Sequence, residues 1–356
     1  MKRGCIFAIL VLCGAGGLAG RPRPAPSDDF ETNYRLGEYY LHAGKLLAGI
    51  PYMQKAASLQ PSNYVVGYDL ALAWYETRNY AKAREQLQAM LARKDTAELH
   101  SLLADVEEAS QDYVAALREY QRAAQMEPSE ERIFDLGTEL LVHQTFDPAI
   151  QVFARGAQLY PKSVKLNLGL GIADYLRGHY EEAVKALCTA SDLAPAQSWP
   201  YLFLGRTYSG ISQVSASGAE EVRKRLSRFA QLQPKNARAL YYYAMSVPDP
   251  NRAEPLLRKA IALDPKFADA HLQLGILYAD RQANQDAARE FERVIALQPS
   301  LTTAHYHLAQ VYRRTGEAER AREELAIFER LHHQDAKQTE EERNEIKQFV
   351  VSMKEQ

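Results

Sequence analysis

The side chains with types suited to catalysis or metal binding are few, and their spacing does not bring them together. His332 and His333 are adjacent, so on a helix they point about 100° apart and cannot hold one metal ion. His305 and His307 diverge similarly, and His305 falls on an apolar stripe where packing is the expected role. Cys188 has no evident cationic neighbour, which favours a small buried side chain over a nucleophile. We therefore predict no catalytic residue, no metal site and no cofactor.

The rest of the sequence agrees with this prediction. It contains no HExxH, no paired CxxC, no G-x-S-x-G and no P-loop. The formal net charge of −2 and the pI near 6.5 provide no basic field for nucleic acid, so nucleic acid is not an expected partner. A mean hydropathy of −0.39 argues against a polytopic membrane protein.

The N-terminus has the pattern of a secretory signal peptide. Two basic residues, Lys2 and Arg3, precede an apolar run, and small residues at Gly17 and Ala19 suit cleavage after Ala19. Residues 5–19 are shorter than the roughly 20 residues that span a bilayer, although an uncleaved membrane tether through them is the alternative. We expect a signal peptide at 1–19, a proline-rich tether at 20–29, and an exported protein in the periplasm or secreted. The alternative is a membrane-anchored protein that faces the periplasm.

A repeat dominates the remaining chain. A proline or a substitute for it marks the end of each unit, at Pro61, Asp95, Pro128, Pro161, Pro195, Pro234, Pro265, Pro299 and His333. The successive spacings are 34, 33, 33, 34, 39, 31, 34 and 34 residues. In register with these marks, a large residue and a small one recur as Leu36-Gly37, Leu70-Ala71, Leu103-Ala104, Leu136-Gly137, Leu170-Gly171, Leu204-Gly205, Tyr243-Ala244, Leu274-Gly275 and Leu308-Ala309.

Within each unit the apolar residues follow helical spacing on both sides of a short break. Small residues such as Gly275 and Ala287 allow two helices to approach closely, and a large residue such as Phe291 fills the space beside them. One such hairpin cannot bury its apolar face alone, so neighbouring units must stack. The pattern predicts a helical array with one continuous core.

These features resemble the tetratricopeptide repeat, a helix–turn–helix unit of about 34 residues. The resemblance covers residues 30–335 and implies an all-α, right-handed α-solenoid of about nine units. A pentatricopeptide array, which reads RNA, fits the period and the charge less well. Residues 336–356, with Ile346, Phe349, Val350 and Met353 on one face, are expected to form a C-terminal capping helix.

Two units depart from the period. The sixth is longer by the segment 210–218, which we expect to be a flexible loop of small residues. The seventh is shorter, with residues 246–255 in place of the normal turn. These segments are expected to form an irregular joint between neighbouring units.

One stripe of the first helix in each unit is expected to face the inner wall of the superhelix. It is rich in aromatic and apolar residues, whereas a solvated wall would be polar, which favours binding of an extended or helical protein segment. Acidic residues in its N-terminal half favour a partner that is basic and apolar. The predicted groove residues are Tyr34, Glu38, Tyr68, Leu72, Tyr75, Asp105, Phe134, Leu141, Leu168, Ile172, Tyr175, Arg206, Tyr241, Ile276 and Tyr306.

The sequence thus predicts a non-enzymatic scaffold or adapter that binds a partner protein or peptide in its groove, in cell-envelope assembly or the organisation of complexes. A membrane-anchored adapter is the alternative. An enzyme subunit that uses the irregular region 210–255 is a further, weaker one. The sequence does not indicate the partner's identity or the oligomeric state.

Overall fold

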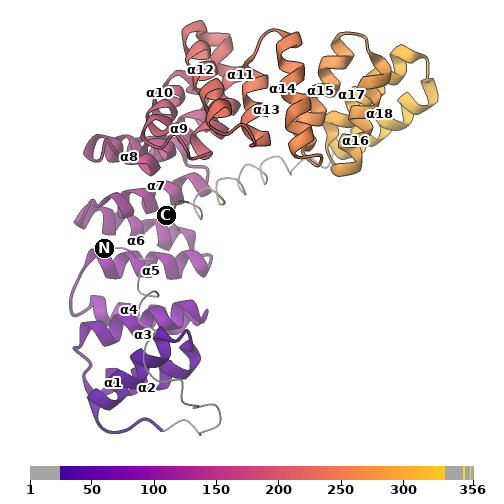
Figure 1. The fold of residues 1–356 in the computed structure, drawn as a ribbon. Coiled ribbons are helices and arrows are strands. Elements are labelled where there is room, and N and C mark those ends of the chain that lie inside the picture. Colours follow the sequence, from indigo (N-terminus) through magenta and orange to yellow (C-terminus); the bar gives the residue numbers. More distant parts are fainter. Residues whose placement is uncertain (1–24, 333–347, 349–352, 354–356) are drawn as a thin grey trace. The chain divides into compact units, whose positions relative to one another are not determined.

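The structure is a computed structural model that describes residues 25–332, Gln348 and Met353. Eighteen helices, and no strand, occur in this part of the chain (Figure 1). They are α1 (Phe30–His42), α2 (Leu46–Leu59), α3 (Tyr64–Glu76), α4 (Tyr80–Leu91), α5 (Ala97–Ala109), α6 (Tyr113–Met126), α7 (Glu130–Val142), α8 (Phe146–Leu159), α9 (Val164–Arg177), α10 (Tyr180–Leu193), α11 (Trp199–Val214), α12 (Ala216–Leu232), α13 (Ala237–Ser246), α14 (Pro250–Leu263), α15 (Ala268–Asp280), α16 (Asn284–Leu297), α17 (Thr302–Thr315) and α18 (Ala318–His332).

Apart from α7, which the boundary between the two units divides, consecutive helices pack as helix–turn–helix pairs, from α1 with α2 to α17 with α18, as the repeat predicts. This confirms an all-α solenoid of hairpins. The chain divides within α7 into an N-terminal unit that ends at Glu139 and a C-terminal unit that begins at Leu140. The expected signal peptide, the tether up to residue 24 and the expected capping helix 336–356 lie outside the described residues, apart from Gln348 and Met353. No helix in the described part is both long enough and apolar enough to cross a bilayer.

The turn inside a hairpin has one recurring feature. A residue with positive φ occupies seven of the nine turns between Phe30 and His332, namely Gly44, Arg78, Gln111, Gln144, Gly178, Gln282 and Gly316. This left-handed conformation reverses the chain after the first helix, at a cost of about 1–2 kcal/mol where the residue is not glycine. The two turns without it belong to the α11–α12 and α13–α14 hairpins, the same units that break the sequence period.

The core confirms the predicted pairing of small with large residues. A Cβ added at Gly37, Gly171 or Gly275 would lie 2.6–2.7 Å from Met53, Leu187 or Phe291 respectively, which in each case is sixteen positions later. Met53, Leu187, Phe291 and Ala287 are all 0% exposed. The small residue therefore fixes how closely the two helices of a hairpin approach.

A polar contact ties five repeats to the residues that precede them. A side chain near the start of the first helix donates to the backbone carbonyl six residues earlier; we call this the repeat clasp. The pairs are Asn33–Ser27 (2.7 Å), Asn167–Pro161 (3.4 Å), Tyr201–Pro195 (3.2 Å), His271–Pro265 (3.2 Å) and His305–Pro299 (3.0 Å). The packing role predicted for His305 is confirmed, because its side chain is buried and held at both ring nitrogens.

Cys188 is buried in α10, as predicted. Burial raises the pKa of its thiol to about 11, because a thiolate is poorly solvated there. The side chain therefore stays protonated near neutral pH and acts as a small apolar residue.

The prediction of a flexible loop at 210–218 is wrong. These residues belong to α11, which has 16 residues, and α12, which has 17, and only Ser215 separates the two helices. A Cβ at Gly210 would lie 2.5 Å from the ring of Tyr180, and one at Gly218 would lie 2.7 Å from Ile211. The glycines therefore allow close helix packing. The irregular backbone expected at 246–255 is limited to residues 247–249, because α14 begins at Pro250.

Candidate peptide-binding surface

Four of the predicted groove residues are not on a surface. Phe134 is 2% exposed, and Leu141, Leu168 and Ile172 are each 0% exposed. The physical reason is clearest for α9, which packs against α8, α10 and α11 and is buried around most of its circumference. These four residues belong to the core and are removed from the candidate surface.

In the N-terminal unit, the predicted residues Tyr34, Glu38, Tyr68, Leu72, Tyr75 and Asp105 stay at least partly exposed. Their polar groups are used within the unit. The hydroxyl of Tyr34 donates to Glu38 at 2.6 Å, which raises the pKa of Tyr34 to about 12. Asp105 accepts a 2.6 Å bond from Tyr120. Two of the carboxylates expected to attract a basic partner thus have internal partners.

Asp69, also in the N-terminal unit, is half-buried, and its carboxylate forms no hydrogen bond or ion pair with any described residue. Burial, and next the nearby charge of Glu38, raise its pKa from 3.8 to about 6. The folded state then keeps this proton to a higher pH than the unfolded state does. Its contribution to stability therefore falls as the pH rises from about 4 to about 6.

We expect Asp69→Asn to stabilise the protein at pH 8, because the substitution removes a carboxylate that burial disfavours. The gain should be about 1 kcal/mol after allowance for solvent screening of this half-buried group, and it should fade towards pH 4. Thermal melts of wild type and variant at both pH values measure it. An equal effect at pH 4 and pH 8 would contradict the assignment.

In the C-terminal unit, two neighbouring depressions contain three of the predicted residues. The first, of about 630 Å³, is lined by Gly205, Arg206, Tyr208, Ser209, Ser212, Gln213, Tyr241, Tyr242, Met245 and Asp269. The second, of about 380 Å³, is lined by Ala244, Met245, Val247, Pro248, Pro250, Ala253, Leu257, Gln273, Ile276, Leu277, Asp280 and Arg281. Met245 lines both depressions, so they form one continuous surface.

The side chains at the centre of this surface are held in place. The ring of Tyr241 lies 5.0 Å from that of Phe267 and 5.3 Å from that of Tyr242. Burial raises the pKa of Tyr241, so its hydroxyl stays neutral and available as a hydrogen-bond donor. The guanidinium of Arg206 lies 5.9 Å from the centre of the Phe203 ring. An aromatic platform with a charged group beside it suits a peptide segment with apolar side chains and a polar backbone.

The other two predicted residues of the C-terminal unit lie outside both depressions. Tyr175 packs edge to face against Phe203, and Tyr306, which is 41% exposed, contacts His307 and Phe328. The surface also includes residues that the predicted set lacked. Met245 shares the repeat position of Ile276, so the register places it on the predicted stripe, although it is not among the predicted groove residues. Ser212 and Gln213 could not be placed while 210–218 was expected to be a loop.

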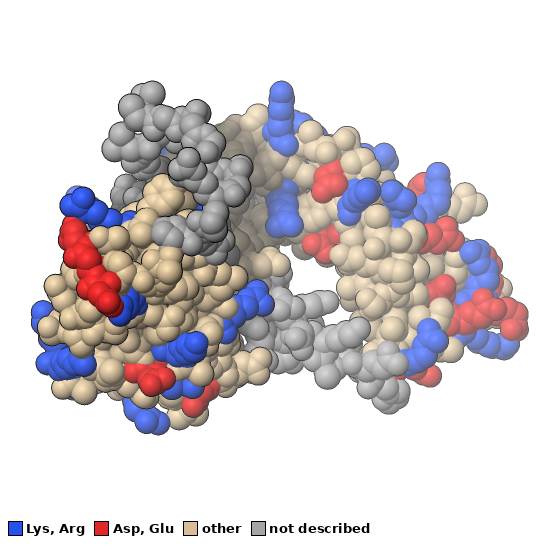
Figure 2. All heavy atoms as spheres, turned by 90° about the horizontal axis from the view of Figure 1, so that it is seen from below, with Lys and Arg blue, Asp and Glu red and all other residues tan. Residues whose placement is uncertain are grey.

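The face shown in Figure 2 has no large patch of a single charge. Basic and acidic side chains are interspersed there over both masses of described atoms. This matches the near-neutral sequence and favours specific local contacts over a long-range field.

Comparisons with known proteins identify the repeat. The tetratricopeptide repeat family matches residues 40–106 and, in two overlapping segments, residues 249–301 and 272–335. No curated protein sequence matches the chain. The chain therefore contains tetratricopeptide repeats in both units.

Comparison with solved structures gives several matches of low sequence identity. The C-terminal part of a TPR repeat-containing protein from Cytophaga hutchinsonii is 16% identical, with a TM-score of 0.54, over 79% of this chain and 99% of that chain. Yeast Tom70 is 13% identical, with a TM-score of 0.47, over 91% and 88%. The MamA protein is 19% identical, with a TM-score of 0.37, over 49% and 94%. At 16% identity, the likeness to the Cytophaga hutchinsonii structure concerns the fold alone.

Proposed function

We propose that this chain is an exported tetratricopeptide-repeat scaffold that binds a segment of a partner protein. The binding surface is the pair of depressions that meet at Met245, with Arg206, Tyr241 and Ile276 as contact residues. The observation that carries the proposal is the continuity of these depressions around a fixed aromatic platform. The repeats support it, because tetratricopeptide domains generally bind protein partners.

Its place of action is proposed from the N-terminal sequence. Cleavage after Ala19 would release the scaffold into the periplasm or the medium, where it would organise a cell-envelope complex. An uncleaved segment 5–19 would instead tether the same scaffold to the membrane. Mass spectrometry of the mature protein distinguishes the two: an N-terminus at Gly20 supports export, and retention of Lys2 supports the tether.

Substitution of Met245 tests the binding surface. Met245 is 37% exposed, so Met245→Asp should preserve the fold while it places a charge between the two depressions. A photo-crosslinking amino acid at Gln273, in the native host, should form an adduct with the partner. We expect Met245→Asp to reduce that adduct about tenfold, as loss of a central contact does.

Met126→Asp is the matched control, because Met126 has a similar exposure of 39% and lies in α6 of the N-terminal unit. It should leave the adduct unchanged. Retention of the adduct in Met245→Asp, with an unchanged thermal melt, would refute the proposed surface.

A further inference from the structure

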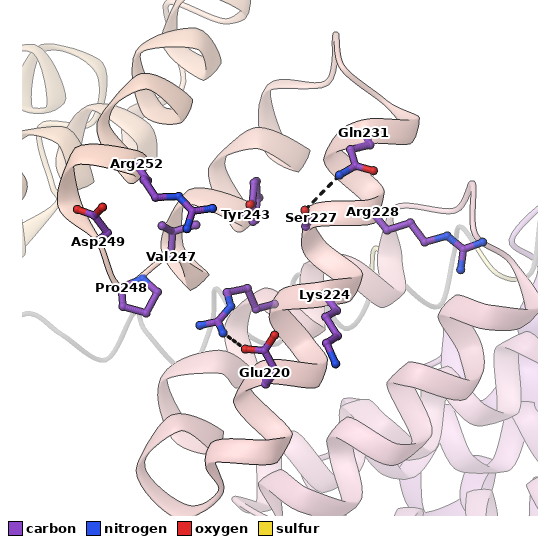
Figure 3. A pocket seen from close by; sticks show the side chains of 11 residues that line it. Glu220, Lys224, Ser227, Arg228, Gln231, Tyr243, Val247, Pro248, Asp249 and Arg252 are labelled. Carbon is purple, nitrogen blue, oxygen red and sulfur yellow. Dashed lines mark hydrogen bonds and ion pairs between the residues drawn. The ribbon is translucent and has the colours of Figure 1, made fainter.

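A third depression in the C-terminal unit, of about 650 Å³, lies between α12 and the α13–α14 turn (Figure 3). It is lined by Glu220, Arg223, Lys224, Ser227, Arg228, Gln231, Tyr243, Val247, Pro248, Asp249 and Arg252. Tyr243 is the only residue of α13 among them. Of the residues that line the surface around Met245, this depression includes only Val247 and Pro248. We call it the basic depression.

The basic depression follows from the two departures in repeat length. With 17 residues, α12 is longer than α2, α10, α14 and α16, which have 14 each. The next hairpin is shorter, since α13 has only 10 residues. One face of α12, from Glu220 to Gln231, thus lies across from the short turn at residues 247–249. The space between them is the depression.

Its charges are unbalanced. Four cations face two carboxylates, and both carboxylates already have partners: Glu220 pairs with Arg223, and Asp249 accepts from the backbone N–H of Asn251 at 2.9 Å. Lys224, Arg228 and Arg252 are exposed and form no ion pair with any described acidic residue. Three cations are therefore available to a ligand.

These three cations are spread apart. Figure 3 shows Arg252 extending from α14 towards Tyr243, whereas Lys224 and Arg228 extend from α12 on the other side of Ser227. A single phosphate or carboxylate could not reach all of them. A chain with several carboxylates could, if it crossed α12 at Ser227 and Gln231.

The floor suits the backbone of such a chain. Val247 and Pro248 provide apolar area, and the half-buried Tyr243 presents a hydroxyl that makes no hydrogen bond among the described residues. Ser227 and Gln231 are joined only by a long bond of 3.5 Å, so both can donate to a backbone carbonyl.

We propose that the basic depression binds an acidic segment of a partner protein. The segment lies across α12 with carboxylates on both sides, paired with Arg252 at one end and with Lys224 and Arg228 at the other. Charge complementarity fixes its class, because three unpaired cations and a neutral, hydrogen-bonding floor select an extended polyanionic peptide. The basic depression shares Val247 and Pro248 with the proposed surface around Met245, but none of its cations lines that surface, so the two proposals can be tested independently.

The test uses two fluorescein-labelled twelve-residue peptides, one with six Glu residues alternating with Gly, Ser and one Tyr, and one with every Glu replaced by Gln. Fluorescence anisotropy with the purified protein, from residue 20 onward, gives the Kd of each. We expect the Glu peptide to bind at least about tenfold more tightly, and to weaken as salt is raised.

The variant that probes the site is the triple substitution Lys224→Gln, Arg228→Gln and Arg252→Gln. Its control is Lys235→Gln, Lys259→Gln and Lys266→Gln, which removes the same charge from exposed positions of the same unit. We expect about a tenfold rise in Kd for the first triple and less than a twofold change for the second, with equal thermal melts.

Equal weakening by both triples would overturn the proposal, because it would indicate non-specific attraction. So would tighter binding of a twelve-base-pair DNA duplex than of the Glu peptide, or complete displacement of the peptide by about 10 mM inorganic phosphate. Met245→Asp should leave peptide binding unchanged, so failure here is distinguishable from failure of the proposed surface around Met245.

Discussion

Phe291→Ala is expected to lower the free energy of unfolding of the C-terminal unit by about 3–5 kcal/mol, the range for loss of a buried aromatic side chain. Phe291 is 0% exposed, and its ring lies against Gly275 on one side and stacks on His307 at 5.4 Å on the other. Removal leaves a cavity between α15, α16 and α17, which a rigid hairpin can close only in part. Urea denaturation followed by circular dichroism measures the loss, and hydrogen exchange in α15 and α16 locates it.

The pairing itself is tested by adding the substitution Gly275→Ala. In wild type the new Cβ would lie 2.7 Å from the Phe291 ring, so the change should cost about 1–3 kcal/mol through overpacking. In the Phe291→Ala background the same Cβ would point into the cavity and should cost much less. The two substitutions should therefore be coupled. If their effects add within about 0.5 kcal/mol, the two residues do not control each other's packing.

This pairing was predictable from the sequence because it is periodic. Gly275 and Phe291 occupy positions that recur in other units, such as Gly171 and Leu187, and a recurring pair of a small and a large residue indicates a fixed helix–helix distance. The predicted role of His305 is confirmed for the same reason, since its repeat position is buried in most units, for example at Asn33, Tyr201 and His271. Structural features that recur in most repeats can thus be predicted from the sequence.

Features that belong to one unit were less accessible. Gly210 and Gly218 favour a flexible loop by local propensity. In the structure, however, a Cβ added at either glycine would lie within 3 Å of a side chain on a neighbouring helix. Tertiary packing overrides the loop propensity of these glycines, and only a structure shows which side chains pack against them. The exposure of groove positions is similarly non-local: Ile172 and Ile276 share one repeat position, yet Ile172 is buried and Ile276 partly exposed. The basic depression depends on helix lengths that the expected loop concealed.

His305→Ala is expected to destabilise the α17–α18 hairpin by about 2–3 kcal/mol, because the ring makes two polar contacts, the repeat clasp to Pro299 and a contact with Glu324. Nε2 must carry a hydrogen, since the Pro299 carbonyl at 3.0 Å can only accept, and Nδ1 lies 2.6 Å from a carboxylate oxygen of Glu324. The ring is 3% exposed, so alanine leaves a partly buried carboxylate and a carbonyl without their partner. Urea denaturation and hydrogen exchange in α17 and α18 measure the loss.

His305→Asn is the matched control, because the chain already uses asparagine at this repeat position. Asn33 and Asn167 donate to the carbonyl six residues earlier at 2.7 and 3.4 Å. Asparagine at 305 should therefore keep the bond to Pro299, lose the contact with Glu324, and cost about half as much as alanine. The same pair of substitutions at His271, whose ring contacts Pro265 and Glu290 in the same way, should give the same order. If asparagine and alanine were equally destabilising at both sites, the repeat clasp would contribute nothing to stability, and the loss would come from the contact with the carboxylate alone.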